Sequence, residues 1–229
     1  GKSSVTRLIA SGLRAGGLKV IAKTTGTAPR IIDEKGKDRI IHRLRSASIG
    51  EQVRLIRNFA KRKPDAVVFE CMAVNPQYQW VAEQKMIKST ISIITNVRPD
   101  HLDEMGSTLT DNAMSLSNTI PFDGTLITAE NKMQHVLENV AKKRNTKIQL
   151  VTSKSISLDY MSKFPYLEHH DNVAVALEVC KEAGIDESIA LEGMLKAEPD
   201  PGATVIWSLN SNGVKNYFVN VFAANDPAS

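Results

Sequence analysis

The sequence predicts an α/β fold, in which a mostly parallel, twisted sheet is flanked by helices and followed by a late β-hairpin. Short apolar runs alternate with amphipathic stretches over most of the chain, as in strands joined by helical crossovers. Near the end, residues 210–213 read Asn-Ser-Asn-Gly, which favours a tight turn between two strands. The chain has 229 residues, of which 42% are hydrophobic, enough for a buried core. We therefore expect residues 1–229 to form one domain.

The individual elements follow from the spacing of apolar residues. The first is a helix that begins after residue 1 and stops at Gly16 and Gly17. Apolar runs predict strands at residues 18–22, 66–69, 91–95, 124–127 and 146–151. Helical spacing predicts helices at residues 49–61, 80–87, 132–142, 171–183 and 186–196. Two final strands are expected at residues 204–209 and 217–222.

Composition excludes several classes of protein. The 29 basic and 25 acidic residues give a net charge of +4, which is spread along the chain except for a denser stretch at residues 35–45. Only 5% of residues are aromatic, so we expect no nucleic-acid partner. No apolar run approaches the roughly 20 residues of a membrane span, and the given chain is expected to be soluble. The two cysteines, Cys71 and Cys180, show no metal-ligand spacing and fit a reducing environment.

The strongest local motif is Gly1-Lys2-Ser3-Ser4 at the start of the first helix. A glycine turn that leads into a helix presents free N–H groups and a positive dipole end to phosphate oxygens. Lys2 would reach the outer phosphates, and a serine hydroxyl would ligate Mg²⁺. On these residues alone, a P-loop-containing fold and an ordinary helix cap are equally good interpretations.

Two further polar residues follow buried strands. Glu70 ends the strand at 66–69, and His101 lies in the loop after the strand at 91–95. The carboxyl ends of neighbouring parallel strands converge on one crevice, so both side chains can face the phosphate loop and share a divalent cation. For each residue alone, the alternative is structural: Glu70 caps the helix at 80–87, and His101 is an ordinary loop histidine.

Together these motifs resemble the central ATPase domain of the Mur ligases and folylpolyglutamate synthetases. The resemblance is carried by residues 1–4, Glu70, residues 96–103 and residues 222–227. Residues 23–27, 70–76, 199–203 and 222–226 resemble the poly-γ-glutamate synthase branch of bacterial capsule biosynthesis. The resemblance implies that the start of the phosphate loop and a smaller C-terminal domain lie outside the given sequence.

This resemblance also implies roles for individual residues. Gly1, Lys2, Ser3 and Ser4 would hold the phosphates of ATP, and Asn172 and Asn225 would contact the nucleotide. Lys2, Glu70 and His101 would be catalytic. Ser3, with Ser4 as the alternative, would ligate Mg²⁺, and Glu70 and His101 would bind a second divalent ion near the γ-phosphate and the acceptor carboxylate.

Two positions depart from the Mur ligase pattern. The carbamylated lysine of many Mur ligases falls at about Ser115 here, and Ala203 replaces the arginine of a Pro-Gly-Arg motif. Neither residue can supply the charge that the family uses at its position. Arg98 and Arg30 are both candidates for a compensating cation, and the sequence does not choose between them.

The resemblance implies an ATP-dependent acid–amino-acid ligase that polymerises glutamate through its γ-carboxyl by way of an acyl phosphate. Its partners would be glutamate, the poly-γ-glutamate chain and small membrane proteins of capsule synthesis and export, at the cytoplasmic face of the membrane. Residues 35–45 would attract the anionic product, unless they form only a solvated loop. The alternative function is a nucleotide-dependent switch or assembly module without ligase chemistry.

Overall fold

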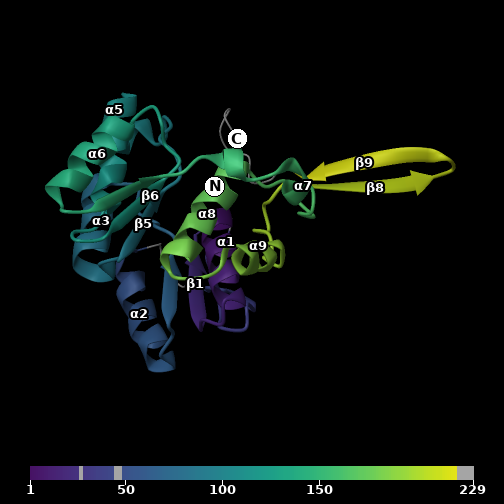
Figure 1. The fold of residues 1–229 in the computed structure, drawn as a ribbon, viewed down its shortest axis with the longest axis horizontal. Coiled ribbons are helices and arrows are strands. Elements are labelled where there is room, and N and C mark those ends of the chain that lie inside the picture. The colour runs from purple at the N-terminus through teal and green to yellow at the C-terminus, as the bar shows by residue number, and fades with distance from the viewer. Residues whose placement is uncertain (26–27, 44–47, 221–229) are drawn as a thin grey trace.

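The computed structural model describes residues 1–25, 28–43 and 48–220, and its helices pack on both sides of a set of mostly parallel strands (Figure 1). One side carries α1 (Lys2–Ala15), α8 (His170–Glu182) and α9 (Glu187–Leu195). The other side carries α2 (Gly50–Arg62), α3 (Pro76–Val81), α5 (Leu109–Leu116) and α6 (Gln134–Lys143). The predicted α/β class is confirmed. Asn225, and Gly26 and Thr27 of the 23–27 motif, lie outside the described residues.

The strands run parallel in two hydrogen-bonded groups. β1 (Val20–Thr24) pairs in parallel with β4 (Ala66–Phe69), with Lys23 opposite Phe69. β5 (Ile91–Ile94), β6 (Thr125–Thr128) and β7 (Lys147–Leu150) form the second group. Within the described residues β4 and β5 are not paired with each other. The parallel pairing of β1 and β4 brings their carboxyl ends to the same edge, where the site described below is built.

Short helical segments connect these elements. They are η1 (Ala82–Ile87), α4 (Leu102–Met105), η2 (Ser117–Thr119), η3 (Ser153–Ser155) and α7 (Leu158–Met161). The helix expected at 80–87 begins four residues earlier as α3 and continues into η1, which has π-helical geometry. The Asn75 side chain caps α3 by accepting a hydrogen bond from the backbone N–H of Gln77, 3.0 Å away. Glu70 is therefore not the cap of this helix.

Residues 30–40 differ from the sequence prediction. β2 (Arg30–Ile32) and β3 (Asp38–Ile40) form an antiparallel hairpin that extends the sheet beyond β1, so residues 38–40 of the basic stretch at 35–45 belong to a strand. In the turn between them, Oδ1 of Asp33 accepts the backbone N–H groups of Lys35 and Lys37. These hydrogen bonds explain why so short a hairpin closes.

The largest core cluster lies between the sheet and α1, α8 and α9, and includes Leu8, Val20, Ile127, Val175 and Met194. Helices α1 and α9 approach closely at Gly193. A β-carbon at that position would lie 2.5 Å from Cβ of Ala15 and 2.8 Å from the carbonyl oxygen of Ser11. This contact fixes α1, and with it the helix N-terminus, against the rest of the core.

Gly193→Ala is expected to lower the free energy of unfolding by about 1–3 kcal/mol. The new methyl group would clash with the backbone of α1, which can give way only if the whole helix shifts. Urea unfolding monitored by circular dichroism measures the change. Gly50→Ala, whose new methyl group would meet only Ser48 Oγ at 3.5 Å, is the matched control and should be neutral or slightly stabilising. Equal stability losses in the two variants would contradict the packing argument.

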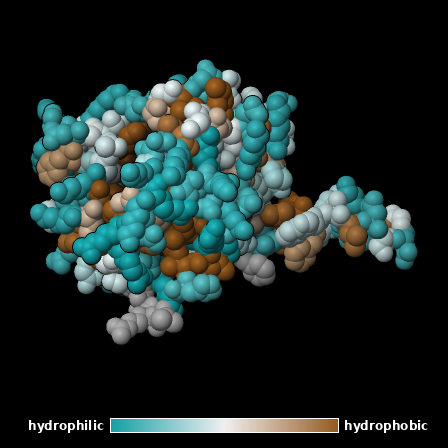
Figure 2. Space-filling model, turned by 90° about the horizontal axis from the view of Figure 1, so that it is seen from below, coloured by the Kyte–Doolittle hydropathy of each residue, from teal (hydrophilic) through white to brown (hydrophobic). Residues whose placement is uncertain are grey.

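The chain ends in the predicted β-hairpin. β8 (Val205–Ser211) and β9 (Val214–Asn220) are joined by Asn212 and Gly213, which both have positive φ values, 51° and 78°. This is the backbone that a two-residue type I′ turn requires. The hairpin projects from the body of the molecule and exposes hydrophobic residues (Figures 1 and 2).

The described residues include no helix with both the length and the apolar character needed to cross a membrane.

Candidate functional site

The side chain of Glu70 is the centre of the candidate site. It follows the last residue of β4 directly and is 5% exposed. Its carboxylate accepts hydrogen bonds from the Ser3 hydroxyl at 2.8 Å, the Thr25 backbone N–H at 2.7 Å and the Thr25 hydroxyl. Three segments distant in sequence therefore meet at one carboxylate: the start of α1, the loop after β1 and the end of β4.

The N-terminus of α1 lies at this carboxylate. Helix α1 begins at Lys2, with Gly1 at the cap position, no side-chain cap and no acidic residue in its first turn. Lys2 is exposed and Ser4 is half-buried. The uncapped end of α1 thus presents N–H groups, a hydroxyl and an ammonium group next to Glu70, a combination suited to phosphate oxygens.

His101 stands in the loop after β5, directly before α4. It is exposed, its φ is 44°, and its Nε2 is 3.5 Å from Oδ1 of Asp100. No hydrogen bond or ion pair joins His101 to Glu70, and the described residues contain no group of three or more His, Cys, Asp or Glu side chains that could hold a metal ion. Hydrogen bonds from Asn112 hold the loop around His101. Its side-chain oxygen accepts the backbone N–H of Asp100, and its side-chain nitrogen donates to the backbone carbonyl of Gly106.

Asn172 is buried in the first turn of α8 and is already engaged. Its side-chain amide donates to Oε1 of Glu168 at 2.7 Å, and the same oxygen accepts the His169 N–H. The other oxygen of Glu168, Oε2, is buried and has no hydrogen-bond partner among the described residues. Sequence reasoning missed Glu168, although it stands four residues before Asn172.

A second buried charge cluster lies beneath the loop after β4. Lys23 is fully buried, and its Nζ lies 3.9 Å from Oε1 of Glu51 and 3.8 Å from Sδ of Met72. Burial lowers the pKa of Lys23, while the charges of Glu51 and Glu70 raise it. Arg43 binds both oxygens of Glu51, at 2.7 and 2.9 Å, and this hydrogen bonding is the main cause of the lowered pKa of Glu51.

The candidates for a compensating cation have different surroundings. Arg30 pairs with Asp38 at 3.4 Å, and Asp38 also pairs with Arg7 at 2.7 Å. Arg30 is therefore committed to a structural carboxylate. Arg98 is exposed in the loop after β5.

Ser115, at the position of the family's carbamylated lysine, is buried on α5 and donates a hydrogen bond to Oε1 of Gln79.

A cavity of about 530 Å³ opens beside the Glu70 loop. It is lined by Met72, Ala73 and Val74 of that loop, by Ser48 and Ile49 before α2, and by Asn75, Tyr78 and Glu104. The Asn75 side chain donates to Glu104 at 2.9 Å across its wall. The cavity begins two residues after Glu70 and is large enough for a small amino acid or a chain end.

Two cysteines differ in their surroundings. Cys71 follows Glu70 and is half-buried, and burial raises the pKa of its thiol. Cys180 on α8 is fully buried behind Gly12, and burial raises its pKa to about 12.

Replacing Arg43 by Met is expected to destabilise the protein by about 3 kcal/mol, because it leaves the Glu51 carboxylate buried and without its hydrogen bonds. The pKa of Glu51 is lowered in the folded state, so this contribution is present at neutral pH and is lost as pH falls through that lowered pKa. Lys23→Met should change the free energy of unfolding by less than about 1 kcal/mol, because it also removes a desolvated charge. Urea titrations at neutral and acidic pH measure both effects. A larger loss for Lys23→Met than for Arg43→Met would contradict this assignment.

Comparison with known proteins adds a family context. The family described as Mur ligase middle domain matches residues 1–198. The chain is 42% identical over 233 residues to "Capsule biosynthesis protein CapB" of Bacillus anthracis and 41% identical over 231 residues to "PGA synthase CapB" of Bacillus subtilis (strain 168). It aligns along its whole length but spans only 50% and 59% of these relatives.

Solved structures show the same fold. E. coli FolC in complex with DHPP and ADP matches with a TM-score of 0.62 and 16% identity, over 88% of this chain and 56% of that one. The bifunctional folylpolyglutamate synthase/dihydrofolate synthase of Yersinia pestis, complexed with AMPPNP and Mn ion, matches with a TM-score of 0.63 and 16% identity, over the same shares.

Proposed function

Because the chain belongs to the Mur ligase middle-domain family, we propose that it binds ATP and activates a carboxylate for amide formation. The observation that carries this proposal is the meeting of Ser3, Thr25 and Glu70 at the uncapped N-terminus of α1. The dipole of α1 favours a bound phosphate there, and the Ser3 hydroxyl and the Glu70 carboxylate can hold its counter-ion. The ADP and AMPPNP bound in the FolC-type structures support the choice of nucleotide.

The reaction of the whole protein is the joining of glutamate through its γ-carboxyl into poly-γ-glutamate. A free carboxylate is a poor acyl donor, because its oxygen would have to leave as oxide. ATP transfers its γ-phosphoryl group to the carboxylate, and the incoming amine then displaces phosphate to form the amide. The similarity to a capsule biosynthesis protein and a PGA synthase supports glutamate as the monomer.

The residues of the α1 end carry the binding. Lys2, exposed in the first turn, contacts the outer phosphates, while the N–H groups from Gly1 to Ser4 bind phosphate oxygens. Asn172 contacts the nucleotide from α8, and Asn225 is a proposed second contact. The Thr25 loop holds Glu70 in place through two hydrogen bonds. Catalysis rests on positioning and charge neutralisation.

The donor set at Glu70 fits a hard divalent cation. Its two carboxylate oxygens, together with the Ser3 hydroxyl 2.8 Å away, are oxygen donors of the kind that Mg²⁺ prefers. When bound, Mg²⁺ neutralises charge on the transferring phosphate. His101 is the proposed third ligand, contributing a nitrogen donor that is unusual for magnesium.

We further propose that the whole protein acts at the cytoplasmic face of the membrane with small membrane proteins of capsule synthesis and export. The resemblance of residues 70–76 and 199–203 to the capsule branch supports this location.

The test of function is phosphate release from ATP by the full-length protein. Release should depend on added glutamate or γ-glutamyl oligomer, because the acyl phosphate forms only on an acceptor carboxylate. A coupled assay for inorganic phosphate, with mass spectrometry of the product, measures both halves of the reaction. Turnover indifferent to any carboxylate acceptor would instead identify a nucleotide-dependent switch.

Lys2→Ala and Glu70→Ala should each lower acceptor-dependent phosphate release at least about 100-fold, since the first removes a cation that would contact the transferring phosphate and the second removes a carboxylate that would hold Mg²⁺. Glu70→Gln keeps the size of the side chain but loses its charge, and should raise the Mg²⁺ concentration needed for half-maximal activity. Lys154→Ala and Glu187→Gln, at exposed positions away from Glu70, are the charge-matched controls and should retain activity. Full activity in both Lys2→Ala and Glu70→Ala would rule out this site.

A further inference from the structure

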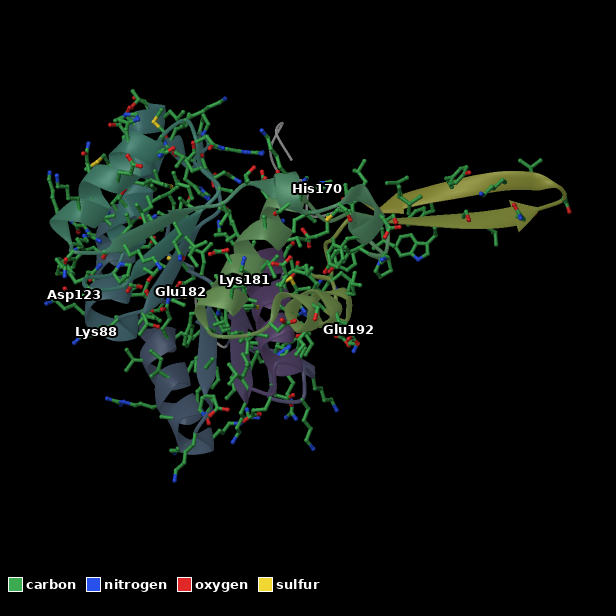
Figure 3. All side chains as sticks on the ribbon, in the orientation of Figure 1. Lys88, Asp123, His170, Lys181, Glu182 and Glu192 are labelled. Carbon is green, nitrogen blue, oxygen red and sulfur yellow. The ribbon has the colours of Figure 1, made fainter. Side chains whose placement is uncertain are left out.

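The outer face of α2 carries three cations, of which Arg54 acts at longer range on Glu51 and adds to the lowering of its pKa by Arg43. Arg54, Arg57 and Lys61 are exposed, and within the described residues none of them forms an ion pair or a hydrogen bond. We call these three residues the α2 cationic face. Neighbouring basic residues are engaged elsewhere, since Arg43 binds Glu51 and Arg62 pairs with Glu34. Nitrogen-bearing side chains extend outward from α2 in Figure 3.

The spacing of these cations is not explained by the stability of the helix. They stand at positions i, i+3 and i+7, so all three project from one side of α2. Like charges at these spacings destabilise a helix. Lys61 lies in the last turn, where the helix dipole favours a cation, but Arg54 and Arg57 lie further from that end. An anionic partner would compensate the mutual repulsion.

A shallow groove of about 470 Å³ runs along this face. It is lined by Gly50, Val53 and Asn58 together with the three cations. Ser48 and Ile49 line the cavity beside the Glu70 loop and directly precede Gly50, which lines the groove. The cavity and the groove therefore both reach the start of α2, the helix labelled in Figure 1.

We propose that the α2 cationic face binds the free α-carboxylates of a γ-linked glutamate chain that extends from the active site, an inference that rests on the proposed function. A γ-linked chain keeps one carboxylate per residue. Its repeat has five backbone bonds, which span about 6 Å when extended. The cations rise about 4.5 and 6 Å along the helix axis, so successive carboxylates match successive cations.

Nucleic acid is the other common polyanion, and the groove disfavours it. None of the six residues that line the groove is aromatic, so no stacking platform for bases is present there. Guanidinium groups bind carboxylates in a bidentate manner, which suits the two arginines.

The experiment measures binding of a fluorescently labelled γ-linked glutamate oligomer by anisotropy, at low and at physiological salt. The triple variant Arg54→Gln, Arg57→Gln, Lys61→Gln should weaken binding about tenfold, because it removes three exposed ion pairs whose small binding free energies add. The control triple Lys132→Gln, Lys142→Gln, Lys143→Gln removes the same charge from exposed positions at α6, and should change affinity less than about threefold. Arg54→Lys with Arg57→Lys keeps the charge and should retain most of the affinity.

Several outcomes would overturn the inference: no oligomer binding by the wild type, unchanged affinity in the α2 glutamine variant, equal losses in both triple variants, or tighter binding of single-stranded RNA than of the oligomer. Circular dichroism melting checks that the variants fold. If the triple variant does not fold, the single variant Arg57→Gln replaces it, with an expected two- to threefold loss of affinity for the oligomer. Glutamate-dependent phosphate release is measured in parallel. If the wild type shows no such release, the proposed function is wrong. If the wild type shows release but the α2 glutamine variant binds the oligomer as tightly as the wild type, only the α2 site is wrong.

Discussion

The hydrogen bonds of the Glu70 carboxylate hold together the part of the molecule to which we assign function. Because β1 and β4 are parallel neighbours, their ends deliver Thr25 and Glu70 to the same edge, and the packing of α1 on the core delivers Ser3. A buried carboxylate is tolerated only when donors surround it, and here they come from three segments. Displacing any one of these segments would leave a charge unsatisfied, so site geometry and local stability are coupled.

The buried charges around Glu51 connect that edge of the sheet to α2. Glu51 lies in the first turn of α2 and binds Arg43, while Lys23 approaches it from β1. Leu55 and Phe59 of the same helix pack against Ile21 of β1. With this inner side of α2 held by ion pairs and apolar contacts, its outer side faces solvent. The orientation of the α2 cationic face therefore follows from the packing of the opposite face.

Regular elements with strong periodicity could be predicted from the sequence. The strand at residues 66–69, the Asp186 cap of α9 and the Asn212-Gly213 turn all follow from local chemistry. The β2–β3 hairpin was missed because its strands are only three residues long and carry charges. The contact of Thr25 with Glu70 was missed because strand register decides it. The left-handed backbone of His101 could not be read from the sequence. The roles of His101, Lys2, Ser3, Glu70, Asn172 and Asn225 stay predictions.

The unequal burial of the two thiols bears on how the molecule can be labelled. Cys180 lies behind Gly12 with a strongly raised pKa, so a maleimide meets it only after the core opens. Cys71 is half-buried, and its raised pKa makes alkylation slow rather than impossible. Of these two thiols, a dye would therefore react first with the one that lies one residue from Glu70. The same difference means that, of the two, the thiol beside the site is oxidised before the thiol in the core.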